Sequence, residues 1–300
     1  MKKVIVVVGP TAVGKTKLSI DLAKELNTSI ISGDSVAVYK GLDIGSAKPT
    51  KEEQKEVKHY LIDIREPNDT YSVADFQADA RKIIDSNELS LICGGTGLYI
   101  QSVLFDYEFE ASKRNLDYSK KYEAYSNLEL YSLLLERDPF IDKTKLHPNN
   151  RKRVLRALEV LEETNKSIHS FDNKKTPLYD YFIVYLSMDR EKLYERINQR
   201  VDIMLNEGLL DEVKSLFDKG IYPHAIGYQE FIPYFNNLIT LTTAIEEIKK
   251  NTRHLAKRQE TWFKNQMNSN FYDASINYND LFNNILSDIK EWYNKWLSIW

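Results

Sequence analysis

The sequence predicts an α/β protein built on a doubly wound parallel sheet, with an α-helical insertion near the middle of the chain. Three observations support this fold class. A glycine-containing loop, residues 9–16, stands between an apolar run and a helical pattern. Apolar runs and helical patterns then alternate as far as residue 104. Beyond that point, residues 105–180 carry helical stretches and no convincing parallel strand.

The loop at residues 9–16 is a complete phosphate-binding motif. It consists of Gly9, Pro10, Thr11, Ala12, Val13, Gly14, Lys15 and Thr16. Its glycines let backbone N–H groups converge on phosphate oxygens at the positive end of the following helix. Lys15 is expected to reach a terminal phosphate, and the Thr16 hydroxyl suits a Mg²⁺ ion. We therefore expect a P-loop NTPase-like core, although a merely tight glycine turn is the alternative and the loop does not identify its phosphate compound.

Length and composition limit the class of protein. The chain has 300 residues, 42% of them hydrophobic, and a net charge of −3, so any nucleic-acid partner must be met by local basic patches. A single cysteine, Cys93, excludes internal disulfides and cysteine zinc sites, and with the phosphate loop it indicates the cytoplasm. No uncharged apolar run is long enough to span a membrane, and a strand begins too early for a signal peptide. We expect a soluble monomer without a membrane partner.

Periodicity assigns the elements in order. Strands are expected at 4–8, 29–32, 59–64, 89–93 and 181–186. Helices are expected at 17–26, 51–58, 72–84, 128–136, 150–163, 193–205, 243–266 and from 278 to the C-terminus. These assignments divide the chain into a core, residues 1–104 and 181–300, and the α-helical insertion at 105–180. Residues 39–49 are rich in glycine and polar groups and are expected to form a functional loop.

Polar residues follow two of the expected strands. Asp34 comes after residues 29–32, and Thr96 follows two glycines after residues 89–93. Ligands of open α/β sheets bind at the carboxyl ends of the strands, so both residues are expected beside the phosphate loop. The alternative for Asp34 is that it only caps a turn. Asp63, within the strand expected at 59–64, is a candidate acid for a second magnesium motif.

Clustered cations indicate a second kind of site. Lys152, Arg153 and Arg156 lie on the helix expected at 150–163, and they form either a solvated basic face or a surface for an anionic polymer. The long helix expected at 243–266 carries Arg253, Lys257 and Arg258. Trp262, on the same helix, either stacks on nucleic acid or packs in the core. Arg200 shares a helix face with Arg196. These arginines either face solvent or bind a diphosphate.

Several motifs together carry a resemblance to a known family. They are residues 9–16, Gly33-Asp34-Ser35 with Tyr39, the loop 42–49, Gly94-Gly95-Thr96-Gly97-Leu98-Tyr99, Ile226-Gly227-Tyr228, and the block from Ala256 to Trp262. In this order, from residue 4 to about residue 265, the chain resembles the tRNA dimethylallyltransferase family. The resemblance implies transfer of a dimethylallyl group from dimethylallyl diphosphate to N6 of the adenine on the 3′ side of the anticodon, with Mg²⁺ as cofactor.

The resemblance also assigns roles to residues. Residues 9–16 with Arg200 would bind the diphosphate, and Lys15 would stabilise the charge that develops on it. Asp34 would take the proton of the adenine amine, and Thr96 would orient the adenine or Asp34. The tRNA contacts would come from Asp34, Ser35, Val36, Ala37, Thr96, Lys152, Arg153, Arg156, Arg253, Lys257 and Arg258. The adenine would be flipped out of its loop. Many family members have glutamine at the position of Ala37.

Three alternatives remain open from the residues alone. An ATP-dependent small-molecule or nucleotide kinase would use the same loop, with Asp34 as base and the insertion as a lid. A non-catalytic nucleotide switch that binds RNA would need an element sensing the γ-phosphate, for which only Asp63 offers itself. Prenyl transfer to free AMP or ADP would need no basic insertion.

Overall fold

The computed structural model of the protein describes residues 1–107, 109, 117–170 and 176–294. The chain divides into two compact units. Unit 1 comprises Met1–Phe105 and Pro177–Trp300, and unit 2 comprises Asp106–Thr176. The sequence analysis placed the same division at 105 and 180. Among the described residues, no helix is both long and apolar enough to cross a membrane.

Unit 1 contains a parallel sheet of six strands among the described residues, in the order β3-β2-β4-β1-β5-β6. The strands are β1 (Lys3–Val8), β2 (Ile30–Ser32), β3 (His59–Tyr60), β4 (Leu89–Cys93), β5 (Asp180–Ser187) and β6 (Asn270–Asp273). The central strand β1 pairs with β4 and β5, with Val7 opposite Cys93 and Val8 opposite Tyr185. Because all pairs are parallel, the carboxyl ends of the strands meet at one edge.

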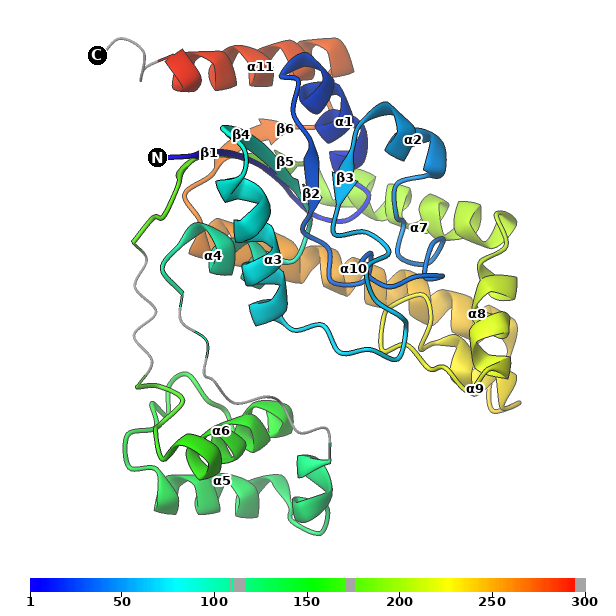
Figure 1. Ribbon diagram of the computed structural model, residues 1–300. Coiled ribbons are helices and arrows are strands. Elements are labelled where there is room, and N and C mark those ends of the chain that lie inside the picture. The colour runs from blue at the N-terminus through cyan, green and yellow to red at the C-terminus, as the bar shows by residue number, and fades with distance from the viewer. Residues whose placement is uncertain (108, 110–116, 171–175, 295–300) are drawn as a thin grey trace. The chain divides into compact units, whose positions relative to one another are not determined.

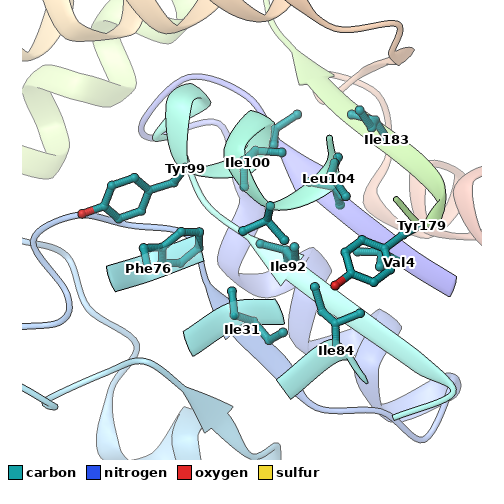
Figure 2. Close-up of a cluster of buried hydrophobic side chains, with 14 of the residues drawn as sticks. Val4, Ile31, Phe76, Ile84, Ile92, Tyr99, Ile100, Leu104, Tyr179 and Ile183 are labelled. Atoms are coloured by element: carbon teal, nitrogen blue, oxygen red, sulfur yellow. The ribbon is translucent and has the colours of Figure 1, made fainter. Parts of the chain in front are cut away.

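Helices cover both faces of this sheet, which confirms the doubly wound fold predicted from the sequence (Figure 1). The helices of unit 1 are α1 (Lys15–Glu25), α2 (Lys51–Glu56), α3 (Val73–Asp85), α4 (Gly97–Leu104), α7 (Arg190–Asn206), α8 (Leu209–Asp218), α9 (Phe231–Phe235), α10 (Leu241–Gln266) and α11 (Tyr278–Asn294). One core lies between the strands and α3 and α4, and Figure 2 shows its side chains. There the rings of Phe76 and Tyr99 stack with centroids 4.3 Å apart. The other core packs α1, α7 and α11 against the opposite face.

A third apolar cluster lies beyond the sheet. It joins α8, α9, the end of α7 and the start of α10 to Leu42 and Tyr228. The loop 42–49 is therefore packed against a helical layer instead of extending into solvent, because Leu42 is 2% exposed.

Unit 2 is helical, as the sequence predicts for this segment. It contains η1 (Tyr118–Tyr122), α5 (Asn127–Arg137) and α6 (Arg151–Thr164). Its own apolar core includes Leu130, Leu134, Val154 and Leu158, all fully buried.

The predicted elements differ from the observed ones in two respects. The strand predicted at 59–64 ends after Tyr60, since Leu61 and Asp63 adopt positive φ angles of 61° and 55°, which a β-strand cannot accommodate. In addition, α4, η1, α8, α9 and β6 were not predicted from the sequence. These elements are short or follow glycine, so their periodicity is weak.

Candidate active site

Three strand-end loops meet at the carboxyl edge of the sheet. The N–H of Gly33, after β2, donates to the Cys93 carbonyl at 2.8 Å, and the N–H of Gly94 donates to the Val7 carbonyl at 3.2 Å. The Thr96 N–H lies 3.4 Å from the Gly33 carbonyl. A Cβ atom on Gly94 would lie 2.2 Å from the Gly33 oxygen, so this close approach requires glycine. The loops that carry Asp34 and Thr96 are thus joined to each other and to the strand leading into the phosphate loop.

The phosphate loop leads from β1 into α1, as predicted. Gly9 has φ +146°, and a Cβ there would lie 2.5 Å from the Leu186 oxygen. Lys15 Nζ donates to the Pro10 carbonyl at 2.7 Å. The pKa of Lys15 is lowered to about 8, mainly by burial and also by the Arg200 charge, while Cys93 and the Asp34 carboxylate oppose the shift. Lys15, Arg200 and Asp34 are therefore close enough to interact electrostatically.

Arg200 lies on α7, which follows β5. Burial lowers the pKa of its guanidinium from the usual range, and the Asp34 carboxylate counteracts that shift. Within the described residues, Arg200 makes no hydrogen bond or ion pair. A partly buried guanidinium without a partner, beside a phosphate loop, is suited to bind an anion bidentately.

Asp34 caps a turn, which is one of the two alternatives that the sequence left open, and the structure leaves room for the other. Its Oδ1 accepts hydrogen bonds from the N–H groups of Val36, at 2.7 Å, and Ala37, at 3.2 Å, and so caps a turn. In the part of the chain that the structure describes, its Oδ2 accepts no hydrogen bond. One oxygen fixes the carboxylate, and the other is left to accept a proton.

The neighbours of Asp34 differ in what they offer a ligand. Ser35 and Val36 are half-buried, whereas Ala37 is 3% exposed. The N–H of Ala37 is bonded to Asp34, and its carbonyl accepts from Asp63 N–H at 3.2 Å. Ala37 therefore presents no unsatisfied polar group to an RNA. Thr96 is the N-cap residue that precedes α4, and its hydroxyl makes no capping bond there.

Of the two candidate magnesium ligands, Thr16 and Asp63, only the Thr16 hydroxyl is available to a metal ion. Thr16 is half-buried at the start of α1, and its hydroxyl makes no hydrogen bond within the described residues. Asp63, the candidate second acid, is engaged instead by Lys48 at 2.6 Å and Lys51 at 3.0 Å. No group of three or more His, Cys, Asp or Glu side chains in the described ranges is arranged to hold a metal. This donor set fits a Mg²⁺ that is held mainly by substrate phosphates and water.

Two side chains that the sequence analysis did not single out organise the loops around this edge. Gln259 of α10 accepts from the Thr11 N–H at 2.9 Å and donates to the Gly95 carbonyl at 3.1 Å. Glu212 of α8 accepts from Tyr228 Oη at 2.7 Å and from three consecutive backbone N–H groups at 2.9 to 3.1 Å. Those three groups belong to Asp43, Ile44 and Gly45. The only signal in the sequence was that Gln259 lies between two cations and a tryptophan in the block 256–262.

The basic residues fall into two groups. Lys152, Arg153, Lys257 and Arg258 are exposed. Arg156 binds the buried carboxylate of Glu159 at 2.8 Å, and Arg253 donates to Asn198 Oδ1 at 2.7 Å. The first group is free to meet phosphates, while the second also has a structural role.

Known proteins resemble this chain over nearly its whole length. The sequence profile of the family described as IPP transferase matches residues 37–266. Proteins named tRNA dimethylallyltransferase from Anoxybacillus flavithermus and Bacillus subtilis are 49% and 47% identical, and each alignment covers 91% of both chains.

Solved structures agree with these sequence matches. The crystal structure of the full-length tRNA isopentenylpyrophosphate transferase from Bacillus halodurans has a TM-score of 0.76 at 39% identity and covers 100% of this chain and 99% of its own. A eukaryotic dimethylallyltransferase described as acting on tRNA has a TM-score of 0.78 at 30% identity and covers 91% of this chain and 74% of its own. The motifs, the parallel sheet and these matches together show that the chain belongs to the IPP transferase family.

Proposed function

We propose that this chain transfers a dimethylallyl group from dimethylallyl diphosphate to the exocyclic N6 of the adenine on the 3′ side of the anticodon in tRNA. The observation that carries the proposal is the meeting of a phosphate loop, a largely buried arginine without a hydrogen bond to any described residue, and a fixed carboxylate at one edge of the sheet. The relatives named above act on tRNA by their names, which supports tRNA as the acceptor.

The residues divide the reaction between them. The bond between the allylic carbon and the diphosphate oxygen breaks, and its electron pair leaves with the diphosphate. A bond from adenine N6 to that carbon forms, and the N6 proton passes to Asp34 Oδ2. Lys15, Arg200 and the loop N–H groups stabilise the charge that develops on the leaving group. Thr96 orients the adenine.

The cofactor is proposed to be Mg²⁺, held by the Thr16 hydroxyl and by the diphosphate itself. When bound, it adds positive charge beside the leaving oxygen. The exposed cations of α6 and α10 are proposed to bind tRNA phosphates. The protein is also proposed to be a monomer in the cytoplasm, and the single cysteine supports that compartment. The nucleotide-switch alternative is disfavoured because Asp63, the acid it would need, is bound to two lysines.

The test is transfer of label from dimethylallyl diphosphate to unmodified tRNA with Mg²⁺, run beside AMP, ADP and ATP. We expect label on tRNA alone. Label on AMP or ADP in place of tRNA, or consumption of ATP without transfer, would contradict the proposal.

A further inference from the structure

The side chain of Gln259 lies between the two loops that would hold the two substrates. Its Oε1 accepts from the Thr11 N–H at 2.9 Å, and its Nε2 donates to the Gly95 carbonyl at 3.1 Å. Thr11 belongs to the phosphate loop, and Gly95 precedes Thr96. A glutamine amide is suited to this bridge because one planar group offers an acceptor and a donor at a fixed separation.

The surrounding packing holds α10 against the glycine loop. A Cβ atom on Gly95 would lie 2.2 Å from Gln259 Nε2, and one on Gly97 would lie 2.2 Å from the Trp262 ring. Phe263, on the same helix, is fully buried in the core beneath the sheet. The amide of Gln259 is therefore supported by a rigid helix in direct contact with the loop, which is a requirement for accurate positioning.

The bridge also changes what the phosphate loop offers to a ligand. The Thr11 N–H points to Gln259, and Pro10 has no N–H, so neither of these two residues offers a backbone donor to a diphosphate. The sequence alone counted Thr11 among the diphosphate-binding residues.

We propose that Gln259 is a positioning residue, which fixes the phosphate loop relative to the Gly95-Thr96 loop and thereby aligns the allylic carbon with the adenine amine. The inference rests on the proposed function. Gln259 touches neither reacting atom. Its effect arises because a reaction between two bound groups is steeply sensitive to their separation, and a misplacement of about 1 Å can cost roughly 100-fold in rate.

The test compares Gln259→Met, which keeps the length of the side chain without its hydrogen bonds, with Glu246→Gln on an exposed part of α10 as the control. Single-turnover transfer is measured with enzyme in excess over tRNA, and the affinities for pyrophosphate and tRNA are measured separately. We expect the Met variant to lower the transfer rate by roughly 10- to 100-fold, with each affinity changed by less than about threefold. An unchanged rate would overturn the proposal. A proportional loss of rate, both affinities and thermal stability would do so too, because it would indicate a purely structural role.

A second variant gives a readout that a structural role would not move. Gln259→Glu retains the acceptor for Thr11, but it can donate to the Gly95 carbonyl only when its carboxyl is protonated. Its rate relative to wild type should therefore rise as the pH is lowered from about 8 to about 6, since a carboxyl facing a carbonyl has a raised pKa. If the rate of Gln259→Glu equals the wild-type rate at every pH, the proposed role of the bridge is contradicted.

Failure of the proposed function is distinguishable from failure of this inference. If wild-type protein transfers no label to tRNA, the function fails. Hydrogen exchange at the Thr11 amide without ligand then still tests the bridge, because Gln259→Met should increase its exchange, and unchanged exchange would contradict it.

Discussion

The carboxyl edge of the sheet and the exposed cations of α6 and α10 are both proposed to bind substrate, but they are built in opposite ways. At the edge, two charged side chains are fixed by the backbone, Asp34 by two N–H groups and Lys15 by the Pro10 carbonyl. Lys152 and Lys257 extend from helix surfaces into solvent. Where the geometry is fixed, the reaction rate depends on the position of single atoms. Exposed cations instead contribute to tRNA binding through their charge, which salt screens and whose effects are roughly additive. Substitutions at the edge should therefore have the larger effects.

The largest effect is expected at Asp34. Asp34→Asn removes the proton acceptor while its Oδ1 can still accept from Val36 and Ala37, so turnover should fall by roughly 10²- to 10⁴-fold with tRNA and pyrophosphate affinity nearly unchanged. Rapid-quench transfer assays and binding titrations measure the two quantities. Asp211→Asn, on the exposed side of α8, is the matched control. Turnover equal to wild type in Asp34→Asn would remove this carboxylate from the mechanism.

The pH dependence of activity tests the role of the Lys15 ammonium. Burial lowers the pKa of Lys15 to about 8, so its ammonium is present below that pH and lost above it. The kcat/KM for dimethylallyl diphosphate should consequently fall by about tenfold per pH unit above pH 8, because the protonated fraction falls by that factor. Lys15→Arg stays charged, so its lower activity should be flat across this range. The same decline in Lys15→Arg would assign the titration to another group.

A smaller effect on activity is expected at Glu212, which holds the loop 42–49 and is not proposed to contact the reacting atoms. Glu212→Gln replaces a carboxylate that accepts from three backbone N–H groups and Tyr228, so exchange of the Asp43 to Gly45 amides should rise by at least about tenfold. Activity toward tRNA should fall severalfold. Hydrogen exchange followed by mass spectrometry measures the first quantity, with Glu247→Gln on α10 as control. Exchange that does not differ from wild type would show that another contact holds the loop.

The smallest effect per residue is expected on the basic face of α6. Replacing Lys152 and Arg153 by alanine should weaken tRNA binding and reduce the slope of log K against log salt by about one to two. Arg156→Ala should act mainly on stability, by about 1–3 kcal/mol, because it leaves the buried Glu159 carboxylate without this partner. Binding at several salt concentrations and thermal unfolding separate the two results. An unchanged slope in the double variant would make this face plain solvated surface.

The features that could be predicted from the sequence are those set by residues close together in the chain. The strand and helix around residues 9–16 and the positions of Asp34 and Thr96 at strand ends could be predicted, because each depends on neighbours in the chain. The roles of Gln259 and Glu212 could not be predicted, since their backbone partners lie 164 to 248 residues away. Asp63 shows the same limit, because a positive φ angle and two lysine partners turn a candidate metal ligand into an ion pair.

The central claim is that Asp34 presents one fixed and one open oxygen to an adenine amine at this edge. The most direct measurement is a crystal structure with tRNA and a non-hydrolysable thio analogue of dimethylallyl diphosphate. We predict a flipped adenine with N6 within about 3.2 Å of Asp34 Oδ2, while Oδ1 keeps its bonds to Val36 and Ala37. An adenine that remains stacked in the anticodon loop, or one whose N6 faces a different side chain, would contradict the account.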